Sequence, residues 1–377
     1  MLSAETRGRL AEAGRLLVCQ ERAQVLVQPR AAERGFWFGA GNICRDAPGI
    51  ASASRETWRR HADGSLVLCG RYRNGGDARA GIAAGPRGAE LALFRSRDGG
   101  ASFGHVLSLL KRDVSPDGEE VLSIEGACLR RTGEGVELYV SSEKRRQYPA
   151  EVRDFQKPGT GVWSIDVMSA RTVEALAGAE VRPVLRSEEP AWLHLKDPVV
   201  FDMGGRAWMI YCAHPFNWTS SNVGLAQRRP DGSFADCARS ILPRGPAWDV
   251  AVCRVTARLA LPGAGVLARG PAVSLYFYDG AECMHEHGAG GRPRGYSCEE
   301  LGGLAAGMDA EFPGLERLSE GSPLFVSPRG TGCSRYVSVF EGDDAYLVTW
   351  QQSQADGSQP LVINRVPKAE LARLLRT

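Results

Sequence analysis

Short apolar stretches, separated by turns rich in Gly, Asp and Pro, recur along this chain. One copy runs from Lys196 to Phe201, turns at Gly204-Gly205, and continues through Ala207 to Tyr211. Short apolar runs bounded by turn residues are typical of β-strands. Similar strand pairs occupy residues 124–140 and 335–350, and looser copies occupy 45–68 and 248–278. Their starts lie roughly 50–90 residues apart, the spacing of propeller blades with insertions. The pattern therefore predicts an all-β fold, a five-bladed β-propeller.

The same pattern predicts elements at both ends of the chain. Residues 3–20 have helical spacing, which places Leu10, Ala13 and Leu17 on one face. A strand over about 23–28 is expected to pair with residues 360–364 and to close the last blade, and a short helix is expected over 368–375. We predict one propeller domain over residues 1–377. Its blades would cover residues 34–112, 120–186, 192–244, 246–320 and 322–366.

Composition narrows the class of protein without changing the fold prediction. The chain has 377 residues, of which 43% are hydrophobic and 24% charged, as in globular proteins. The net charge of +2 gives no argument for a nucleic-acid or membrane partner. No apolar run approaches the ~20 residues of a membrane span, and the first residues lack the pattern of a secretory signal. The ten cysteines include no C-x-x-C pair, so we expect reduced thiols in a bacterial-type cytoplasm.

The predicted blades bring charged residues to one place. In a propeller the innermost strand of each blade starts near the central channel, so residues at those starts converge on one pocket. The starts predicted here carry Asp46, Glu125, Asp197, Asp249 and Arg335. The repeat thus predicts a carboxylate-lined site.

Two of these acids stand in local patterns that favour a function. Pro198 fixes an extended entry after Asp197, so rigid backbone aims the carboxylate. Glu125 opens a strand although Glu has low β-propensity, which indicates that another requirement holds it there. The structural alternative for Asp197 is a buried cap on neighbouring strand amides. By contrast, residues 96–103 match the Asp-box, S-x-D-x-G-x-x-F/W, a hairpin turn that we expect to be structural.

The basic and histidine-containing segments leave alternatives open. Arg335 is suited to bind a carboxylate or phosphate, or to pair with a central acid. Arg71, Arg73 and Glu143 end second strands and are either pocket-rim groups or solvated charges. The insertion over 280–296 contains an H-x-H pattern but no zinc-type spacing. We therefore expect no metal and no cofactor, and interpret this segment as a pocket-lining loop.

Short motifs occur in a consistent order along the chain. These motifs are Ser123-Ile124-Glu125-Gly126, Val140-Ser141-Ser142-Glu143, Gly161-Val162-Trp163-Ser164-Ile165-Asp166, Lys196-Asp197-Pro198-Val199-Val200 and Tyr276-Phe277-Tyr278-Asp279-Gly280. They resemble stretches of the five-bladed propeller glycoside hydrolases, the broad group of families 43, 32, 68, 117 and 130, and the similarity covers about residues 36–366.

The resemblance implies a glycosidase that acts on a small sugar or glycoside by carboxylate general acid–base catalysis. Carried over by position, Asp46 is the base or nucleophile, Glu125 the general acid and Asp197 the orienting acid. Because three converging carboxylates repel one another, we expect Glu125 or Asp197 to titrate near neutral pH. The expected substrate-binding residues are Arg71, Glu143, Lys196, His214, Asp249, Asp279, Glu282, His285 and Arg335.

The chain also departs from the family pattern. Ala281 stands where an Arg is expected after Tyr278-Asp279-Gly280, and residues 299–305 lack an expected Arg-Thr pair. These departures keep two alternatives open. One is a non-hydrolytic enzyme of secondary metabolism, such as a lyase, cyclase or transferase. The other is an inactive carbohydrate-binding protein.

Overall fold

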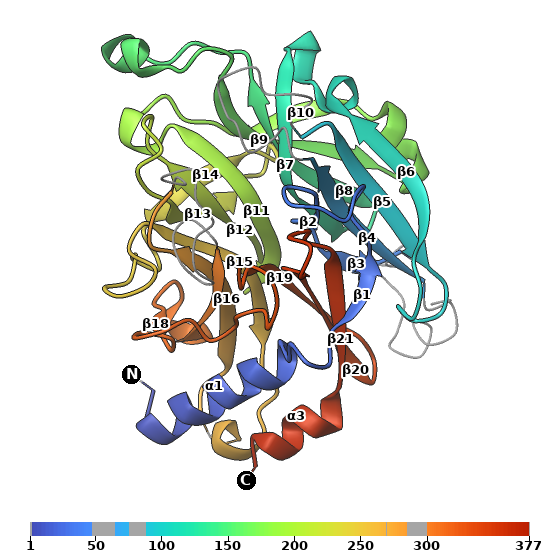
Figure 1. The fold of residues 1–377 in the computed structure, drawn as a ribbon, viewed down its shortest axis with the longest axis vertical. Coiled ribbons are helices and arrows are strands. Elements are labelled where there is room, and N and C mark those ends of the chain that lie inside the picture. Colours follow the sequence, from blue (N-terminus) through green and yellow to red (C-terminus); the bar gives the residue numbers. More distant parts are fainter. Residues whose placement is uncertain (1, 47–64, 75–87, 269, 285–299, 377) are drawn as a thin grey trace.

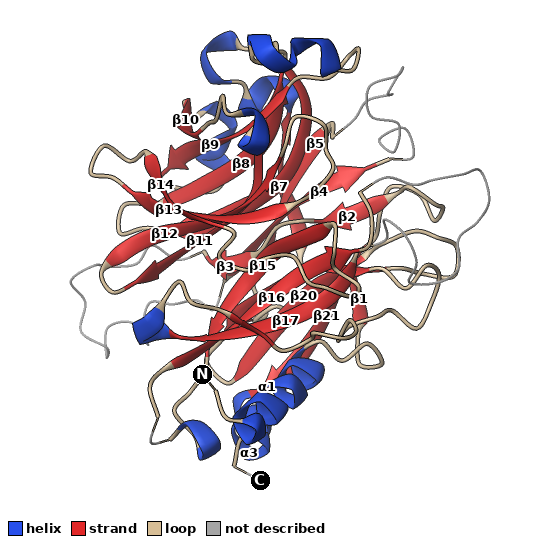
Figure 2. Cartoon of the chain, turned by 90° about the vertical axis from the view of Figure 1, so that its left-hand side faces the viewer, coloured by secondary structure: helices blue, strands red, loops and turns tan. Residues whose placement is uncertain are grey.

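The chain forms a five-bladed β-propeller, which confirms the predicted fold class. The computed structural model describes residues 2–46, 65–74, 88–268, 270–284 and 300–376. Each blade is a twisted antiparallel sheet, and the blades surround a central axis (Figures 1 and 2). No helix in these ranges is long and apolar enough to span a bilayer.

The first three blades follow one another along the chain, and each is built from its innermost strand outward. Blade one contains β2 (Trp37–Gly39), β3 (Ile43–Arg45), β4 (Leu66–Arg73), β5 (Glu90–Ser96) and β6 (Gly104–Leu110). Blade two contains β7 (Val121–Arg131), β8 (Val136–Lys144), β9 (Val162–Ala170) and β10 (Val181–Leu185). Blade three contains β11 (His194–Met203), β12 (Arg206–His214), β13 (Asn222–Arg228) and β14 (Phe234–Arg239). In blades one and two the order of pairing is β2-β4-β5-β6 and β7-β8-β9-β10.

The last two blades share this antiparallel design. Blade four contains β15 (Val252–Ala260), β16 (Val273–Ala281), β17 (Leu301–Met308) and β18 (Glu316–Arg317). Blade five contains β19 (Ser334–Glu341), β20 (Ala345–Gln352), β21 (Leu361–Pro367) and β1 (Gln24–Val27). The strand β1 comes from the N-terminal side of blade one, and it pairs antiparallel with β21 from Gln24 opposite Ile363 to Val27 opposite Leu361.

Two helices cover one end of the propeller. The helix α1 (Ala4–Leu17) begins at Ser3, whose Oγ accepts the Thr6 N–H, and its buried face carries Leu10, Ala13 and Leu17. This face packs against apolar side chains of blades four and five, and α3 (Lys368–Leu374) lies beside it (Figures 1 and 2). Burial of these apolar faces against the sheets explains why the terminal segments are helical.

The core lies between neighbouring blades. Side chains of β5 in blade one pack against those of β7 and β8 in blade two, and β12 and β13 of blade three pack against β15 and β16 of blade four. The innermost strands β7, β11, β15 and β19 contact their neighbours around the axis. This contact brings residues far apart in the sequence into one polar cluster.

The Asp-box is a structural turn, as predicted. Ser96 Oγ accepts the Gly100 N–H at 2.8 Å, and Asp98 Oδ1 accepts the Ser102 N–H at 3.0 Å. Phe103 packs against the apolar core of blade one. The turn joins β5 to β6 on the outer part of the blade, away from the axis.

Candidate functional site

Three innermost strands carry a β-bulge at equivalent places beside the axis. The pairing register shifts at residues 125–126 of β7, at 197–198 of β11 and at 336–337 of β19. A bulge bends its strand and re-aims the side chain at that point. The first residues of these bulges are Glu125, Asp197 and Tyr336.

The backbone at this position is left-handed in three blades. Asp197 has φ 54°, Tyr336 has φ 53°, and Ala40, between β2 and β3, has φ 60°. For a residue other than Gly this conformation costs about 1–2 kcal/mol, and such strain concentrates at functional sites. In blade one the equivalent position is therefore Ala40, which has no polar side chain.

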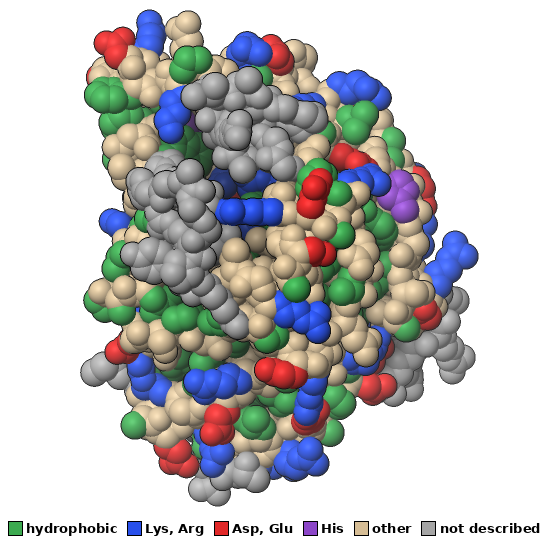
Figure 3. Space-filling view, viewed as in Figure 1, with side chains coloured by type: hydrophobic (Ala, Val, Ile, Leu, Met, Phe, Trp, Pro, Cys, Tyr) green, Lys and Arg blue, Asp and Glu red, His purple; other side chains and the backbone are tan. Residues whose placement is uncertain are grey.

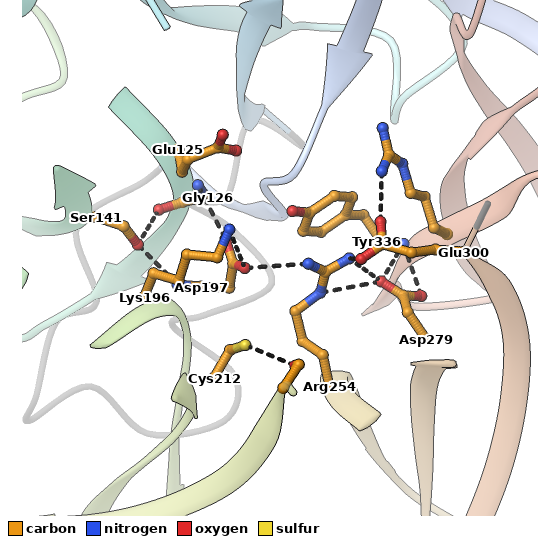
Figure 4. A network of polar contacts seen from close by, with 12 residues as sticks. Glu125, Gly126, Ser141, Lys196, Asp197, Cys212, Arg254, Asp279, Glu300 and Tyr336 are labelled. Atoms are coloured by element: carbon orange, nitrogen blue, oxygen red, sulfur yellow. Dashed lines mark hydrogen bonds and ion pairs between the residues drawn. The ribbon is translucent and has the colours of Figure 1, made fainter. Parts of the chain in front are cut away.

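Ser141 of β8 holds the bulges of blades two and three together. Its Oγ donates to the Gly126 carbonyl at 2.8 Å and accepts the Asp197 N–H at 2.7 Å. Asp197 Oδ1 accepts the Gly126 N–H at 3.1 Å (Figure 4). A Cβ at Gly126 would lie 2.4 Å from that carboxylate oxygen, so the close approach requires Gly. These contacts fix the direction of the Asp197 carboxylate.

Around the three bulges lies a group of charged side chains that we call the central cluster. The surface is hollowed on the face drawn in Figure 3, and Lys and Arg side chains are visible within the hollow. Glu125, Lys196 and Glu300 keep 11–12% of their side chains exposed, whereas Arg71 and Arg254 are almost fully buried. The central cluster consists of Arg71, Glu125, Lys196, Asp197, Arg254, Asp279, Glu300, Arg335 and Tyr336.

Arg254 of β15 is the hub of the central cluster. Its Nη2 lies 2.7 Å from Asp279 Oδ2 and 2.8 Å from Glu300 Oε1, and its Nη1 lies 3.3 Å from Asp197 Oδ2. Asp279 also accepts the Tyr336 N–H at 3.0 Å (Figure 4). One buried guanidinium thus connects blades three, four and five and supports the left-handed backbone at Tyr336.

The ring of Tyr336 lies among three guanidinium groups. The central carbon of Arg254 is 4.0 Å from the ring centroid, that of Arg335 is 5.5 Å and that of Arg71 is 6.0 Å. Burial and the nearby carboxylates raise the pKa of Tyr336 well above its usual value, although Arg254 opposes them. The hydroxyl therefore keeps its proton at neutral pH.

The charges of the central cluster oppose the expected general-acid role of Glu125. Burial disfavours its ionised form, but the positive charges of Arg71 and Lys196 prevail and lower its pKa to about 2. The same competition, with Arg254 and Arg335, lowers the pKa of Glu300. We expected Glu125 or Asp197 to titrate near neutral pH. For Glu125 the pKa is lowered instead, because the expectation considered repulsion among carboxylates and left out the buried arginines.

Asp279 differs from Glu300 although both contact Arg254. Burial and the charge of Glu300 raise the pKa of Asp279 to about 7, against the attraction of Arg254. Its side chain is fully buried and its oxygens accept from Arg254 and Tyr336. Asp279 therefore supports other residues of the cluster, and the structure does not place it at a surface open to a ligand.

Aromatic rings border the central cluster at Lys196. Its ammonium lies 5.5 Å from the ring centroid of Trp163 and 5.8 Å from that of Trp218. Trp218 also packs against the rings of His194 and His214, with centroids 4.4 Å and 4.6 Å away. Trp218 is partly exposed, so an apolar ring borders the central cluster at the surface.

Both histidines beneath Trp218 are buried and hydrogen-bonded. His214 Nδ1 donates to the Ser220 carbonyl, and its Nε2 lies 3.3 Å from Cys212 Sγ. Burial, reinforced by the charge of Lys196, lowers the pKa of His194 to about 3, and it lowers that of His214 as well. His214, expected to bind substrate, instead supports Trp218.

The buried histidines predict a stability that depends on pH. An unfolded histidine has a pKa of ~6.5, so below that value the unfolded chain takes up a proton that the native chain resists. The stability that the neutral buried histidines contribute is present in full above the unfolded pKa of ~6.5. It declines as the pH falls toward the native pKa. We expect wild type to lose about 2 kcal/mol more than His194→Gln between about pH 7.5 and pH 5. Urea unfolding of both proteins at the two pH values measures this, and parallel losses would contradict it.

Asp46 does not reach the axis, which corrects the first of the catalytic assignments. Its carboxylate pairs with Arg95 Nε at 2.5 Å, and its N–H donates to the Ser65 carbonyl. Ser65 precedes Leu66, which opens β4, whereas Arg71 of the central cluster lies five residues further along that strand. At ~3.3 Å per residue this separates the two ends by about 16 Å. Asp46 stands after β3, beyond the bend that Ala40 makes.

Asp249 is also away from the central cluster. Its Oδ2 accepts from the Tyr278 hydroxyl and from Arg317 Nε, both at 3.0 Å. Arg317 belongs to β18, the outermost strand of blade four. Tyr278 precedes Asp279 in β16, so their side chains point to opposite faces of the sheet. Asp249 therefore ties a loop to the outer part of blade four.

The other expected binding residues have mixed positions. Glu143 is buried and accepts the Gly161 N–H at 2.7 Å, which joins β8 to the start of β9. Glu282 follows the end of β16, and His285 lies outside the described residues. Lys196, Arg71 and Arg335 do belong to the central cluster. Among the described residues no group of three His, Cys, Asp or Glu side chains is arranged to hold a metal ion.

Sequence reasoning missed three residues of the cluster as site residues: Arg254, Glu300 and Tyr336. Tyr336 follows Arg335 just as Asp197 follows Lys196, and this spacing was the available signal. Glu300 lies just before β17, at the end of a loop for which no repeat predicts a position. Arg254 lies inside an apolar strand and could have been noticed as an unexplained buried charge.

The whole chain is similar in fold to solved glycoside-active enzymes, although no family model and no curated protein matches it. A structure described as a glycoside hydrolase has a TM-score of 0.59 and 13% identity over 97% of this chain and 96% of its own. An α-L-arabinofuranosidase from Lactobacillus brevis has a TM-score of 0.54 and 10% identity over 92% and 93%. A β-1,2-mannobiose phosphorylase from Listeria innocua has a TM-score of 0.50 and 12% identity over 93% and 96%. The chain thus shares the five-bladed propeller fold of these enzymes from end to end.

Proposed function

We propose that this protein is a carbohydrate-active enzyme, glycosidase-like, that binds a small sugar or glycoside at the central cluster. The observation that carries this proposal is the pair of carboxylates Glu125 and Asp197. Adjacent blades present them at bulges beside the axis, next to Lys196 and the Trp218 ring. Two fixed carboxylates are the minimum that glycosidic bond cleavage usually requires. The likeness in fold to glycoside hydrolases supports the same class.

The proposed roles differ from those expected for the family. Glu125, with its lowered pKa, acts as the base or nucleophile, because it is ionised at neutral pH. Asp197 orients the substrate, since its own direction is fixed by Ser141 and Gly126. Tyr336 is the candidate proton donor, because its hydroxyl remains protonated beside these carboxylates.

A second candidate function is that of a lyase. It is favoured by the absence of an acid at the blade-one bend and by the position of Tyr336. Ala40 stands at the blade-one position, and Tyr336 stands at the blade-five position among three arginines. Ionised Glu125 is suited to remove a proton from carbon, the arginines stabilise the negative charge that develops, and Tyr336, which keeps its proton, is suited to protonate the leaving group. This matches the non-hydrolytic enzyme that the sequence left open.

Activity on a panel of aryl glycosides and oligosaccharides tests the proposal. We expect turnover by wild type and a loss of at least about 10²-fold in kcat for Asp197→Asn, since a fixed acid contributes that much. Release of a reducing sugar without unsaturation indicates hydrolysis, and ultraviolet absorbance of an unsaturated sugar indicates a lyase. Full activity of Asp197→Asn would remove the carboxylate pair from the mechanism.

A further inference from the structure

Four buried nitrogen atoms between blades one and five find no acceptor in the described parts of the chain. They are Arg71 Nε and Nη1, Arg335 Nη2 and Gln351 Nε2. Their residues are at most 7% exposed. A buried donor without a partner is destabilising, and native proteins rarely leave several together. The arrangement indicates that an acceptor from outside the chain belongs here.

The three side chains adjoin one another. Arg335 and Gln351 are opposite each other in the β19–β20 ladder, and Arg335 Nε donates to Gln351 Oε1 at 3.0 Å. Arg71 is opposite Gly39 in the β2–β4 ladder. A Cβ at Gly39 would lie 2.6 Å from Gln351 Cγ, so this Gly lets Gln351 approach the strand that faces Arg71. Both guanidinium groups also flank the ring of Tyr336.

The contacts that Arg71 and Arg335 make do not use all of their N–H groups. Among the residues that the structure describes, Arg71 forms one ion pair, with Glu125. Arg335 pairs with Glu300 through Nη1 and stacks on Trp37, with its central carbon 3.8 Å from the ring centroid. Each guanidinium is thus held in place by a carboxylate or a ring while other N–H groups remain available. A planar guanidinium held in this way suits bidentate binding of a carboxylate.

The charge around the donors favours an anion. The central cluster contains four cations, Arg71, Lys196, Arg254 and Arg335, and four carboxylates, Glu125, Asp197, Asp279 and Glu300. Because the pKa of Asp279 is raised to about 7, this carboxyl group is protonated in part at neutral pH, and the cluster carries a net positive charge. A bound carboxylate offsets that charge.

We propose that the substrate is a sugar acid whose carboxylate is bound by Arg71, Arg335 and Gln351. The inference rests on the proposed function, because Arg71 also contacts Glu125 and so places the bound carboxylate next to the proposed reacting group. The sugar ring then extends toward Tyr336 and Asp197. This names a substrate class for the site: a uronic acid or a related acidic sugar, free or in a glycoside.

Isothermal titration calorimetry with matched pairs of ligands tests this. The probes are D-glucuronate, D-galacturonate and N-acetylneuraminate, with D-glucose, D-galactose and N-acetylmannosamine as neutral partners and inorganic phosphate as a separate anion. We expect at least one acid to bind about tenfold or more tightly than its neutral partner, the effect of one charge-assisted contact. This comparison uses wild type and needs no variant to fold.

The matched variants are Arg335→Gln and Arg45→Gln. Arg45 pairs with the exposed Asp343 outside the central cluster, so its replacement controls for the loss of an arginine. We expect Arg335→Gln to weaken binding of the acid about tenfold or more and Arg45→Gln to change it less than about twofold. Equal affinity for acids and neutral sugars, or phosphate binding as tightly as the best acid, would overturn the proposal.

The binding and activity measurements fail independently. If a sugar acid binds through Arg335 but its methyl glycoside is neither hydrolysed nor converted to an unsaturated product, the ligand class stands and the proposed enzyme does not. If neutral glycosides are cleaved while no acid is preferred, the enzyme stands and the sugar-acid inference is wrong.

Discussion

Replacing Glu125 with Gln is expected to lower kcat by about 10²–10⁴-fold, the usual contribution of a positioned acid or base. The side chain keeps its size, but it loses the charge that faces Arg71 and that the lowered pKa maintains at neutral pH. Because the reaction requires ionised Glu125, whose pKa is lowered, wild-type activity should be insensitive to acidification until well below pH 5. Steady-state rates on the best substrate of the glycoside panel, measured across pH, give both results.

Asp46→Asn is the matched control for this variant. It makes the same chemical change in another acid that pairs with an arginine, Arg95, about 16 Å along β4 from the cluster. We expect it to keep its activity within about twofold of wild type, since changes away from a site have small effects. Equal losses in the two variants would mean that Glu125 acts through stability alone, and a selective loss in Asp46→Asn would restore the original assignment of the base.

The second large effect is expected on stability. Arg254→Met should lower the free energy of unfolding by about 3–5 kcal/mol, because it leaves a buried carboxylate without its counterion. Asp279 is fully buried and depends on Arg254 for two hydrogen bonds. The loss of one guanidinium also removes a partner from Glu300, which precedes β17 of the same blade, and from Asp197 of blade three. Chemical denaturation followed by tryptophan fluorescence measures the change.

Arg45→Met provides the comparison. It makes the same substitution in an exposed ion pair, whose acid, Asp343, is 83% exposed. Such surface pairs contribute at most about 1 kcal/mol. If the two variants lose equal stability, the central cluster contributes no more than a surface pair and Arg254 is not the hub described here.

The fold was predictable because it depends on patterns that every blade repeats. Apolar runs bounded by Gly turns gave the strands, and the terminal helix followed from Leu10, Ala13 and Leu17 on one face. Each of these apolar strands is stabilised because its side chains are buried between neighbouring blades. The order and type of the strands could therefore be derived without knowing any contact in space.

The site was less predictable because bulges, and not strand starts, decide which side chains reach the axis. Arg45-Asp46-Ala47-Pro48 and Lys196-Asp197-Pro198 look alike in sequence, yet blade one has already begun its inner strand at Trp37. Its residue at the bend is Ala40. The spacing shared by Lys196-Asp197 and Arg335-Tyr336 is the one sign of these bulges that the sequence contains, and it does not extend to blade one. Tyr336 likewise resembles an ordinary strand aromatic until the register places it beside Arg254.

The pairing of β1 with β21 has a consequence for how the protein is made. Gln24 is synthesised more than three hundred residues before its partner Ile363. Until then blade five lacks its outer strand and β1 presents unpaired backbone groups, which are a template for non-native pairing. Contacts between such distant residues slow folding because the intervening chain must be ordered first. Synthesis of β21, and not the folding of any one blade, therefore sets the moment at which the ring can close.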